Sequence, residues 1–224
     1  MTKTFITRLS AWAGGIANSA EWDEWALGKR DILSGAKGPD ISFTDPMFRR
    51  RLSAISRMTV QVVHDLLPVG EDVKMIFLSF RGEFSRQFQV NKMLIEEGSV
   101  SPAAFSLSVF NAPAALATMA LDLKGGYSAL YPGKDSFAAG LVAAQAALYS
   151  GAASHIIFVY ADEEAPPEYE CYFRDFPRAI AFALLLSRSE RPLSVPLLSI
   201  TGDEDNPLAF LKQLLLCGKI HVSP

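Results

Sequence analysis

Two continuous apolar runs, at residues 74–80 (KMIFLSF) and 155–163 (HIIFVYADE), constrain the fold of this chain more than any other feature. Short runs rich in β-branched and aromatic residues are typical of strands that are buried on both faces of a sheet. Residues 127–131 (YSALY) have the character of a further short strand. Because segments of helical pattern separate these strands, the sequence predicts an α/β fold with a mainly parallel sheet and helices on both faces.

The helical segments are recognised by the spacing of their apolar residues. Between residues 45 and 67 these recur three, four and seven positions apart, which predicts one amphipathic helix with Pro46 at its first position. Two further helices are predicted at residues 83–98 and 111–125, each ending at a glycine. Residues 136–149 are apolar on almost every side, so they predict a helix that is buried all round.

Both ends of the chain add to the predicted sheet and its cover. After a first strand, Ser19 is predicted to cap a short helix in which Trp22 and Trp25 share one face and pack in the core. Residues 178–188 and 194–202 predict two consecutive late strands, which would give the sheet an antiparallel edge. An amphipathic helix closes the chain.

The composition is that of one sizeable domain spanning residues 1–224, with no repeat or linker that divides it. A net charge of −3 gives no basic face for nucleic acid, so nucleic acid is not an expected partner. The N-terminus lacks the core of a signal peptide, and no run reaches the ~18–20 apolar residues that span a bilayer, so we expect a soluble cytoplasmic protein without a membrane partner. Cys171 and Cys217 are too few for a disulfide framework or a zinc site, and no cofactor or metal is expected.

The stretch LYPGKDSFAAG, residues 130–140, has the form of a strand, a tight turn and a helix start, on which many enzymes mount a nucleophile. Pro132 and Gly133 favour the turn, and Asp135 can cap the following helix by accepting backbone N–H bonds. The segment therefore raises the question whether Lys134 or one of its neighbours is a nucleophile.

Three segments carry a resemblance to a known family. Residues 5–32 contain an apolar strand, a glycine turn and a short helix with Trp and a Gly-Lys ending (FITRLSAWAGGIANSAEWDEWALGKRDI). Residues 101–125 contain Ser-Pro, Asn-Ala and Leu-Lys-Gly in series, and residues 148–163 lead from a small-residue turn to a strand that ends in Ala-Asp-Glu. In this order and spacing, the segments resemble the N-terminal half of the β-ketoacyl synthases, the thiolase-like condensing enzymes of fatty acid and polyketide synthesis.

The resemblance implies a thiolase-like fold with a catalytic cysteine at the elbow, where the start of a helix lowers the pKa of the thiol. The family landmarks put this position at Lys134, yet the sequence has no cysteine before residue 171. A lysine amine that took up an acyl group would form an amide and end chain elongation, so a catalytic Lys134 is not expected. We interpret Gly133, Lys134, Asp135 and Ser136 as a vestigial elbow in a catalytically incompetent chain.

The family's two catalytic histidines belong to a C-terminal half that residues 1–224 do not include. His64, His155 and His221 match neither of them and are interpreted as ordinary core or surface residues. Cys171 is interpreted as a loop thiol without a neighbouring base, and Cys217 as a packing residue of the last helix.

The resemblance also implies a role and a partner. It suggests a non-catalytic accessory subunit, similar to the chain-length factors of aryl-polyene-type pathways, that pairs with a full-length ketosynthase. Tyr127, Ser128, Ala129, Leu130 and Tyr131 form the candidate dimer strand. A lone half of such a fold would leave apolar helix surface uncovered, so we expect either a homodimer or a heterodimer with a ketosynthase.

A second hypothesis is a binding module for an acyl carrier protein. Arg49, Arg50 and Arg51 are consecutive and lie near the start of a predicted helix, where they do not complement the helix dipole. They form either a solvated face or a patch that attracts an acidic partner such as a carrier protein.

A third hypothesis is an acyltransferase or hydrolase that uses a nucleophile foreign to the family, with Asp135, Ser136 or Cys171 in play. Such an enzyme needs a base within hydrogen-bond reach of the nucleophile, and the sequence spacing offers none.

Overall fold

A six-stranded sheet with the order β3-β2-β4-β5-β1-β6 forms the centre of the computed structural model, which describes residues 3–36, 38–67, 72–131, 136–151, 153–172, 178–197 and 206–223. The strands are β1 (Phe5–Ala13), β2 (Lys74–Leu78), β3 (Tyr127–Leu130), β4 (His155–Asp162), β5 (Ile180–Ser187) and β6 (Val195–Pro196). β2 pairs in parallel with β3 and β4, whereas β5 is antiparallel to β4 and β1, and β6 is antiparallel to β1. The strands β1 to β4 therefore share one direction, and the predicted fold class is confirmed.

The central strands are buried because helices cover both faces of the sheet. Every residue of β4 and of β5 is buried. Successive side chains of a strand point to opposite faces, so Phe158 and Tyr160 belong to one hydrophobic cluster and Ile157 and Val159 to the other. The continuous apolar runs thus supply two cores, as the sequence predicts for strands buried on both faces.

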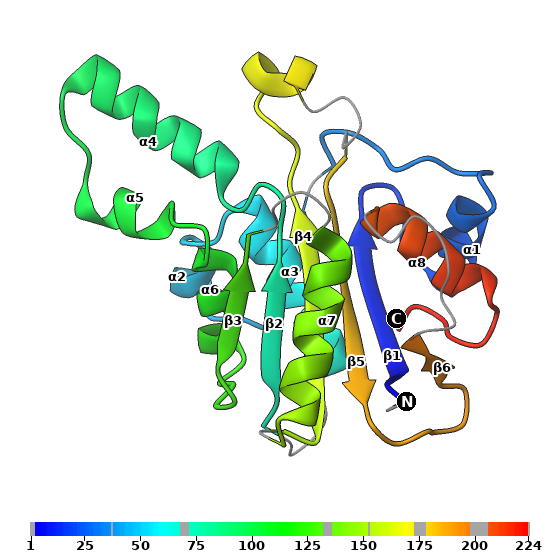
Figure 1. Ribbon diagram of the computed structural model, residues 1–224. Helices are drawn as coiled ribbons and strands as arrows, with labels where there is room; N and C mark the ends of the chain where they lie inside the picture. The colour runs from blue at the N-terminus through cyan, green and yellow to red at the C-terminus, as the bar shows by residue number, and fades with distance from the viewer. Residues whose placement is uncertain are drawn as a thin grey trace.

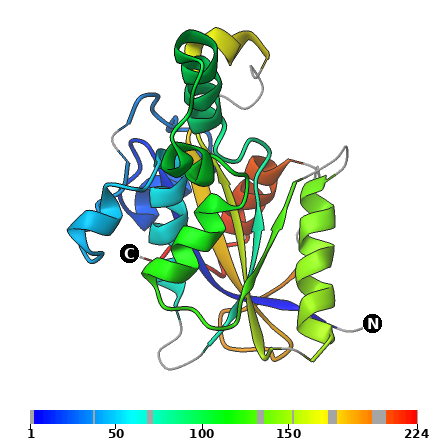
Figure 2. The same cartoon turned by 90° about the vertical axis from the view of Figure 1, so that its left-hand side faces the viewer.

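The helices are α1 (Ser19–Ala26), α2 (Pro46–Arg49), α3 (Ala54–Leu66), α4 (Phe84–Glu97), α5 (Pro102–Leu107), α6 (Ala112–Ala120), α7 (Ser136–Tyr149) and α8 (Pro207–Leu216), with a short 3-10 helix, η1, at Pro167–Tyr172. In Figure 1, α7 and α8 lie over one face of the sheet, with α1 beside α8. Figure 2 shows α3 and α6 on the opposite side of the sheet from α7. α4 and α5 project from the body of the molecule (Figure 1).

The helix predicted between residues 45 and 67 is two helices in the structure, α2 and α3. The prediction was wrong here because the apolar stripe continues across a break. The break is set by Ser53, whose Oγ accepts a hydrogen bond from the backbone N–H of Ser56 (3.1 Å) and so caps a new helix. Pro46 does stand at the start of α2, as predicted.

The cap of α1 also differs from the prediction. Asn18 caps this helix by accepting a hydrogen bond from the N–H of Glu21 (3.1 Å), while Ser19 is already its first residue. The prediction for the two tryptophans is confirmed: Trp22 and Trp25 are buried and their rings meet edge to face at 5.4 Å.

Gly125 does not end a helix, because α6 already stops at Ala120. A Cβ atom on Gly125 would overlap the backbone of Val73, so this close approach requires glycine. The approach brings β3 alongside β2, with Tyr127 opposite Met75. The glycine that suggests a helix end therefore serves strand pairing, and α5 was not expected at all.

α7 is not buried all round, which corrects the prediction for this helix. Its inner side packs closely on the sheet, and a Cβ atom on Gly140 would lie 2.5 Å from Leu78 Cδ1. Its outer side exposes Ala139, Val142 and Ala146, and Val142 is 61% exposed. Only one helical layer covers this face of the sheet in the part of the chain that the structure describes, so the outer apolar residues meet no second layer.

The last predicted strand is shorter than expected, since β6 contains only Val195 and Pro196 and residues 198–202 lie outside the described ranges. α8 closes the chain as predicted. Among the helices of the described residues, none has both the length and the apolar character needed to cross a bilayer.

Candidate functional site

The carboxyl ends of β2, β3 and β4 meet at one edge of the sheet, because these three strands run in parallel. In open α/β sheets, this edge is where loops and helix starts bring functional groups together. The connection from β3 to α7 leaves from this edge, and the arm formed by α4 and α5 extends beyond it (Figure 1). We therefore take it as the candidate site.

The predicted elbow lies mostly outside the described residues. This applies to Gly133, Lys134 and Asp135, and Ser136 is described only as the first residue of α7. The flanks have the predicted form, since β3 ends at Leu130 and leads into a helix. The roles of the four elbow residues stay a prediction.

Phe137 anchors the start of α7 and is fully buried. Its ring meets Phe158 at 5.7 Å and Tyr160 at 6.0 Å, both edge to face, and lies 5.2 Å from Phe210 of α8. Aromatic pairs at these distances are stabilising beyond the area that they bury. The cluster fixes where the beginning of α7 stands above the sheet.

Asp162, the last residue of β4, organises the turn that follows β2. Its carboxylate accepts hydrogen bonds from the hydroxyls of Ser79 (2.7 Å) and Tyr160 (2.6 Å) and from the backbone N–H of Arg81 (2.9 Å). The backbone N–H of Phe80 also donates to it (3.1 Å), and Arg81 Nε lies 3.8 Å away. Asp162 is fully buried, so these donors replace the water that it loses on folding.

The surroundings also set the protonation of Asp162 and Tyr160. Burial raises the pKa of Asp162, whereas the charge of Arg81 and the donated hydrogen bonds act in the opposite direction. Burial raises the pKa of the Tyr160 hydroxyl well above its usual range, and the charge of Asp162 adds to this effect. Tyr160 therefore remains a hydrogen-bond donor that joins with Ser79 in locking β4 to the turn after β2.

Two further carboxyl groups, Glu83 and Glu163, are buried beside this turn. Glu83 Oε1 accepts hydrogen bonds from the hydroxyls of Ser53 (2.7 Å) and Ser56 (2.6 Å), and Glu163 Oε1 accepts one from the backbone N–H of Ser85 (2.9 Å). Burial raises the pKa of both, that of Glu163 to about 7, and repulsion from Glu83 contributes to the shift of Glu163. Glu163 can therefore exchange a proton near neutral pH.

Arg86 ties the α4–α5 arm to the body of the molecule. Its guanidinium donates hydrogen bonds to the carbonyl oxygens of Leu107 (3.2 Å), at the end of α5, and of Arg51 (3.0 Å), just after α2. Its Nε also lies 3.9 Å from Glu83 Oε2. The base of the arm is thus fixed to the same buried carboxylate that holds the start of α3.

A pocket of about 510 Å³ opens beside Glu163 and is lined by Ser53, Ser85 and Arg86 among other residues. The serine hydroxyls of the pocket already have hydrogen-bond partners. The Ser53 hydroxyl donates to Glu83 and also caps α3. The Ser85 hydroxyl donates to the carbonyl oxygen of Glu164 (3.4 Å). Within the described residues, no cluster of three or more His, Cys, Asp or Glu side chains could hold a metal ion. The described lining of the pocket therefore contains a carboxyl group that can exchange a proton near neutral pH, that of Glu163, beside serine hydroxyls that already have hydrogen-bond partners.

The cysteines and histidines do not complete this site. Cys171 is exposed on η1, and Cys217 is exposed after the last turn of α8, which corrects its interpretation as a packing residue. His155 opens β4 and His64 lies near the end of α3 that leads into β2, so both stand toward the amino ends of these strands. His221 is exposed in the C-terminal tail.

β3 forms an outer edge of the sheet and pairs only with β2 in the part of the chain that the structure describes. Residues 127–130 are half-buried, and Tyr131 is 72% exposed. The N–H of Met75 donates to the carbonyl oxygen just before β3 (3.0 Å). The alternation of a parallel ladder then turns the N–H of Ser128 toward β2 and that of Ala129 outward. The candidate dimer strand thus has backbone donors that face away from the sheet.

An apolar arm, defined here as α4 and α5, lies next to the outer edge that β3 forms. It exposes Leu94 (54%), Ile95 (83%) and Phe105 (62%), and within α4 only Val90 is buried. Figure 2 looks onto β3 and shows the arm above the strand and α6 beside it. Met119 of α6 is also exposed (61%). The edge and the arm together form a surface that combines backbone donors with apolar side chains.

The predicted carrier-protein patch lies at the end of α2. Arg49 is half-buried, whereas Arg50 and Arg51 are exposed. Among the described residues, none of the three forms an ion pair with a carboxylate. The patch therefore presents uncompensated positive charge.

The sequence patterns did not predict the three buried acids, Glu83, Asp162 and Glu163. The available signal was the Ala-Asp-Glu ending of the strand at residues 155–162, because a charged residue that directly follows a buried run needs internal partners. Those partners come from distant parts of the chain: Ser79 precedes Asp162 by 83 positions, and Ser85 precedes Glu163 by 78.

We expect Glu163→Gln to stabilise the protein more at pH 8 than at pH 5. The pKa of Glu163 rises from 4.5 to about 7 on folding, so the stability that its protonated form contributes is complete below pH 4.5 and is lost as the pH rises through 7. An amide stays neutral, which should make the gain in unfolding free energy about 2 kcal/mol larger at pH 8. Urea unfolding at both pH values measures this. Glu190→Gln, an exposed carboxylate, controls for the loss of one charge, and an equal effect of Glu163→Gln at both pH values would contradict the prediction.

Comparison with solved structures identifies relatives of the fold. A ketosynthase (ApeO) in complex with its chain length factor (ApeC) from Xenorhabdus doucetiae matches with a TM-score of 0.74 and 28% identity, over 84% of this chain and 80% of that chain. The ishigamide ketosynthase/chain length factor matches with a TM-score of 0.69 and 15% identity, over 87% of this chain. The type II polyketide ketosynthase AntDE in complex with the acyl carrier protein AntF matches with a TM-score of 0.66 and 12% identity, over 84% of this chain. At these last two identities the likeness concerns the fold alone, and this chain covers 64% and 62% of the matched chains.

Comparison of the sequence with curated proteins finds no match. A family model described as the N-terminal domain of β-ketoacyl synthases matches residues 22–208, which is most of the chain. The match includes the buried strands β2 and β4, the candidate dimer strand and the connection that carries the predicted elbow. The chain therefore belongs to the β-ketoacyl synthase N-terminal domain family.

Proposed function

We propose that this chain is a catalytically incompetent subunit, similar to a chain-length factor, that pairs with a full-length ketosynthase in bacterial fatty acid or polyketide synthesis of the aryl polyene type. The observation that carries the proposal is the open edge of β3 beside the apolar arm. Both features favour binding to a protein partner, because an unpaired strand edge and a cluster of exposed apolar side chains are unfavourable in water.

The relation to the ApeO–ApeC complex supports this proposal. The shared region is 84% of this chain and 80% of the matched one, so the two chains are close in length. The two partners in that complex are a ketosynthase and its chain length factor. A ketosynthase is the corresponding partner proposed for this chain.

The lack of a suitable thiol supports catalytic incompetence. The family resemblance puts the nucleophile at Lys134, and the nearest cysteine in sequence is Cys171, which is exposed on η1. Acyl transfer through a thioester needs a thiolate held beside a base. Among the described residues, Cys171 forms no hydrogen bond or ion pair that would supply one.

Ala129→Pro should weaken the binding of a full-length ketosynthase at least about tenfold, because it removes the outward backbone donor at the centre of β3. The bonds between β3 and β2 should survive, since the Ala129 N–H does not take part in them. The affinity is measured by biolayer interferometry with the ketosynthase encoded nearest to this chain.

Ala129→Ser is the matched control, because serine is nearly the same size and keeps the N–H. It should bind the ketosynthase as the wild type does. Equal affinities for Ala129→Pro and Ala129→Ser, with both variants folded by circular dichroism, would exclude β3 from the interface.

A contact with an acyl carrier protein is a second candidate function, favoured by the uncompensated charge of Arg50 and Arg51. Carrier proteins are generally acidic, so attraction to this patch would increase the rate of association and would weaken with added salt.

Arg51→Glu should reduce carrier-protein binding several-fold and flatten its dependence on salt, because it reverses one exposed charge. Surface plasmon resonance at low and high salt measures both effects. Arg188→Glu, an exposed arginine in the turn after β5, makes the same change in net charge elsewhere. If both variants lost affinity equally, the overall charge would be responsible and the patch would not.

A further inference from the structure

We propose that the hollow between α2, α3 and the loop at residues 38–41 is an anion site that binds a phosphate group, either free or as part of a larger ligand. The hollow has a volume of about 650 Å³. It is lined by Gly38, Pro39, Asp40, Ile41, Pro46, Arg49, Arg50 and Arg57. The site lies on α2 and α3 and does not depend on the proposed pairing with a ketosynthase.

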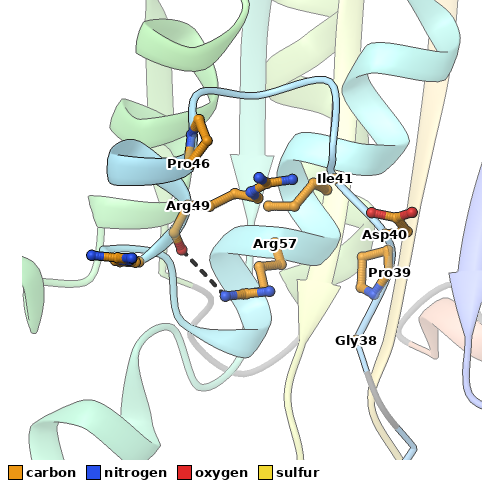
Figure 3. Close-up of a pocket in the computed structure, with 8 residues that line it drawn as sticks. Gly38, Pro39, Asp40, Ile41, Pro46, Arg49 and Arg57 are labelled. Carbon is orange, nitrogen blue, oxygen red and sulfur yellow. Dashed lines mark hydrogen bonds between the residues drawn. The ribbon is translucent and has the colours of Figure 1, made fainter.

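The arginines converge on this hollow from two helices. Figure 3 shows Arg49 extending from α2 toward Ile41, with Arg57 of α3 nearby and Pro39 and Asp40 across from them. Arg49 and Arg57 are both half-buried, so the hollow recesses them from the surface. Arg50 also contributes to the lining and is exposed.

Arg57 is positioned before any ligand arrives. Its Nη2 donates a hydrogen bond to the carbonyl oxygen of Arg49 (3.2 Å), and its Nε donates to that of Leu52 (3.5 Å). These bonds place the Arg57 guanidinium beside the backbone of Arg49, whose side chain carries the second guanidinium. They leave further N–H donors of Arg57 for a ligand, because a guanidinium has five. A pre-positioned cation loses less entropy when it binds an anion.

The charge of these side chains is not neutralised within the protein. In the described ranges, Arg49, Arg50 and Arg57 form no ion pair with a carboxylate. Asp40 is the one acidic residue of the lining, and it is exposed and accepts a hydrogen bond from the N–H of Ser42 (2.9 Å). The lining therefore contains three arginines and one aspartate, and this excess of positive charge favours a bound anion.

A phosphate group fits this arrangement better than the carboxylates of an acidic protein surface. Its two charges and several acceptor oxygens can take paired N–H bonds from more than one guanidinium, which is the preferred geometry of arginine. The recessed positions of Arg49 and Arg57 suit a small group that enters the hollow. Exposed Arg51, which does not line it, suits contact with a protein surface.

The test is a calorimetric titration of the isolated chain with inorganic phosphate and with pyrophosphate at an ionic strength of about 0.1 M. We expect saturable binding with a Kd of about 1 mM or tighter. Arg49→Gln and Arg57→Gln should each weaken binding about tenfold, as expected for the loss of a charge-assisted hydrogen bond. The Arg49 side chain forms no hydrogen bond or ion pair within the described residues, so its substitution keeps the test valid even if Arg57→Gln impairs folding.

Arg188→Gln removes the same charge from the turn after β5 and should leave the Kd unchanged. Equal weakening by Arg188→Gln and Arg49→Gln, or the lack of saturable binding by either anion, would overturn the proposal. Tighter binding of an acidic carrier protein that bears no phosphate group than of pyrophosphate, lost with Arg49→Gln, would also overturn it in favour of a protein-contact site. None of these results affects the ketosynthase proposal, because the isolated chain is titrated.

Discussion

The parallel pairing of β2 with β4, buried between helices on both faces, is the constraint on which the rest of the structure depends. Strands buried in this way can satisfy their polar ends only with internal partners. Asp162 meets this need for the turn after β2, because it accepts hydrogen bonds from Ser79, Phe80 and Arg81. Glu83 and Glu163 follow the ends of the same strands and connect the starts of α3 and α4 to the sheet. The carboxyl ends of β2 and β4 are therefore held to the neighbouring turn and helix starts by buried acidic side chains.

The outside of the molecule contrasts with this interior. In the part of the chain that the structure describes, the outer side of α7 and the apolar arm are exposed and the outer edge of β3 has no strand beside it, although their composition suits burial. Elsewhere in the described residues, the sheet is covered as in any α/β protein. The uncovered surfaces agree with the family assignment to an N-terminal domain, and they are the basis for proposing an assembled state. In the proposed complex, this subunit contributes the binding surface, and the ketosynthase partner carries out the reaction.

Much of the fold could be predicted from the sequence, because it is encoded in local patterns. The apolar runs at residues 74–80 and 155–163 gave the buried strands, and Trp22 and Trp25 gave a packing face. Wrong predictions arose where one signal has two meanings. Gly125 allows a close strand approach and looks like a helix end. The all-apolar surface of α7 predicted burial on every side, but the residues that the structure describes leave its outer side exposed. The buried acids depend on contacts between residues far apart in sequence, which periodicity does not reveal. The arginine hollow lies within residues 38–57, but it depends on how the loop at residues 38–41 packs beside α2 and α3, and periodicity does not reveal this either.

The most direct test of the central claim is the solution mass of this chain, by light scattering, alone and mixed with the full-length ketosynthase encoded nearest to it. A subunit that pairs through the β3 edge and the apolar arm should form a stable complex with equal numbers of both chains. A homodimer that ignores the ketosynthase, or a monomer whose mass does not change in the mixture, would contradict the claim.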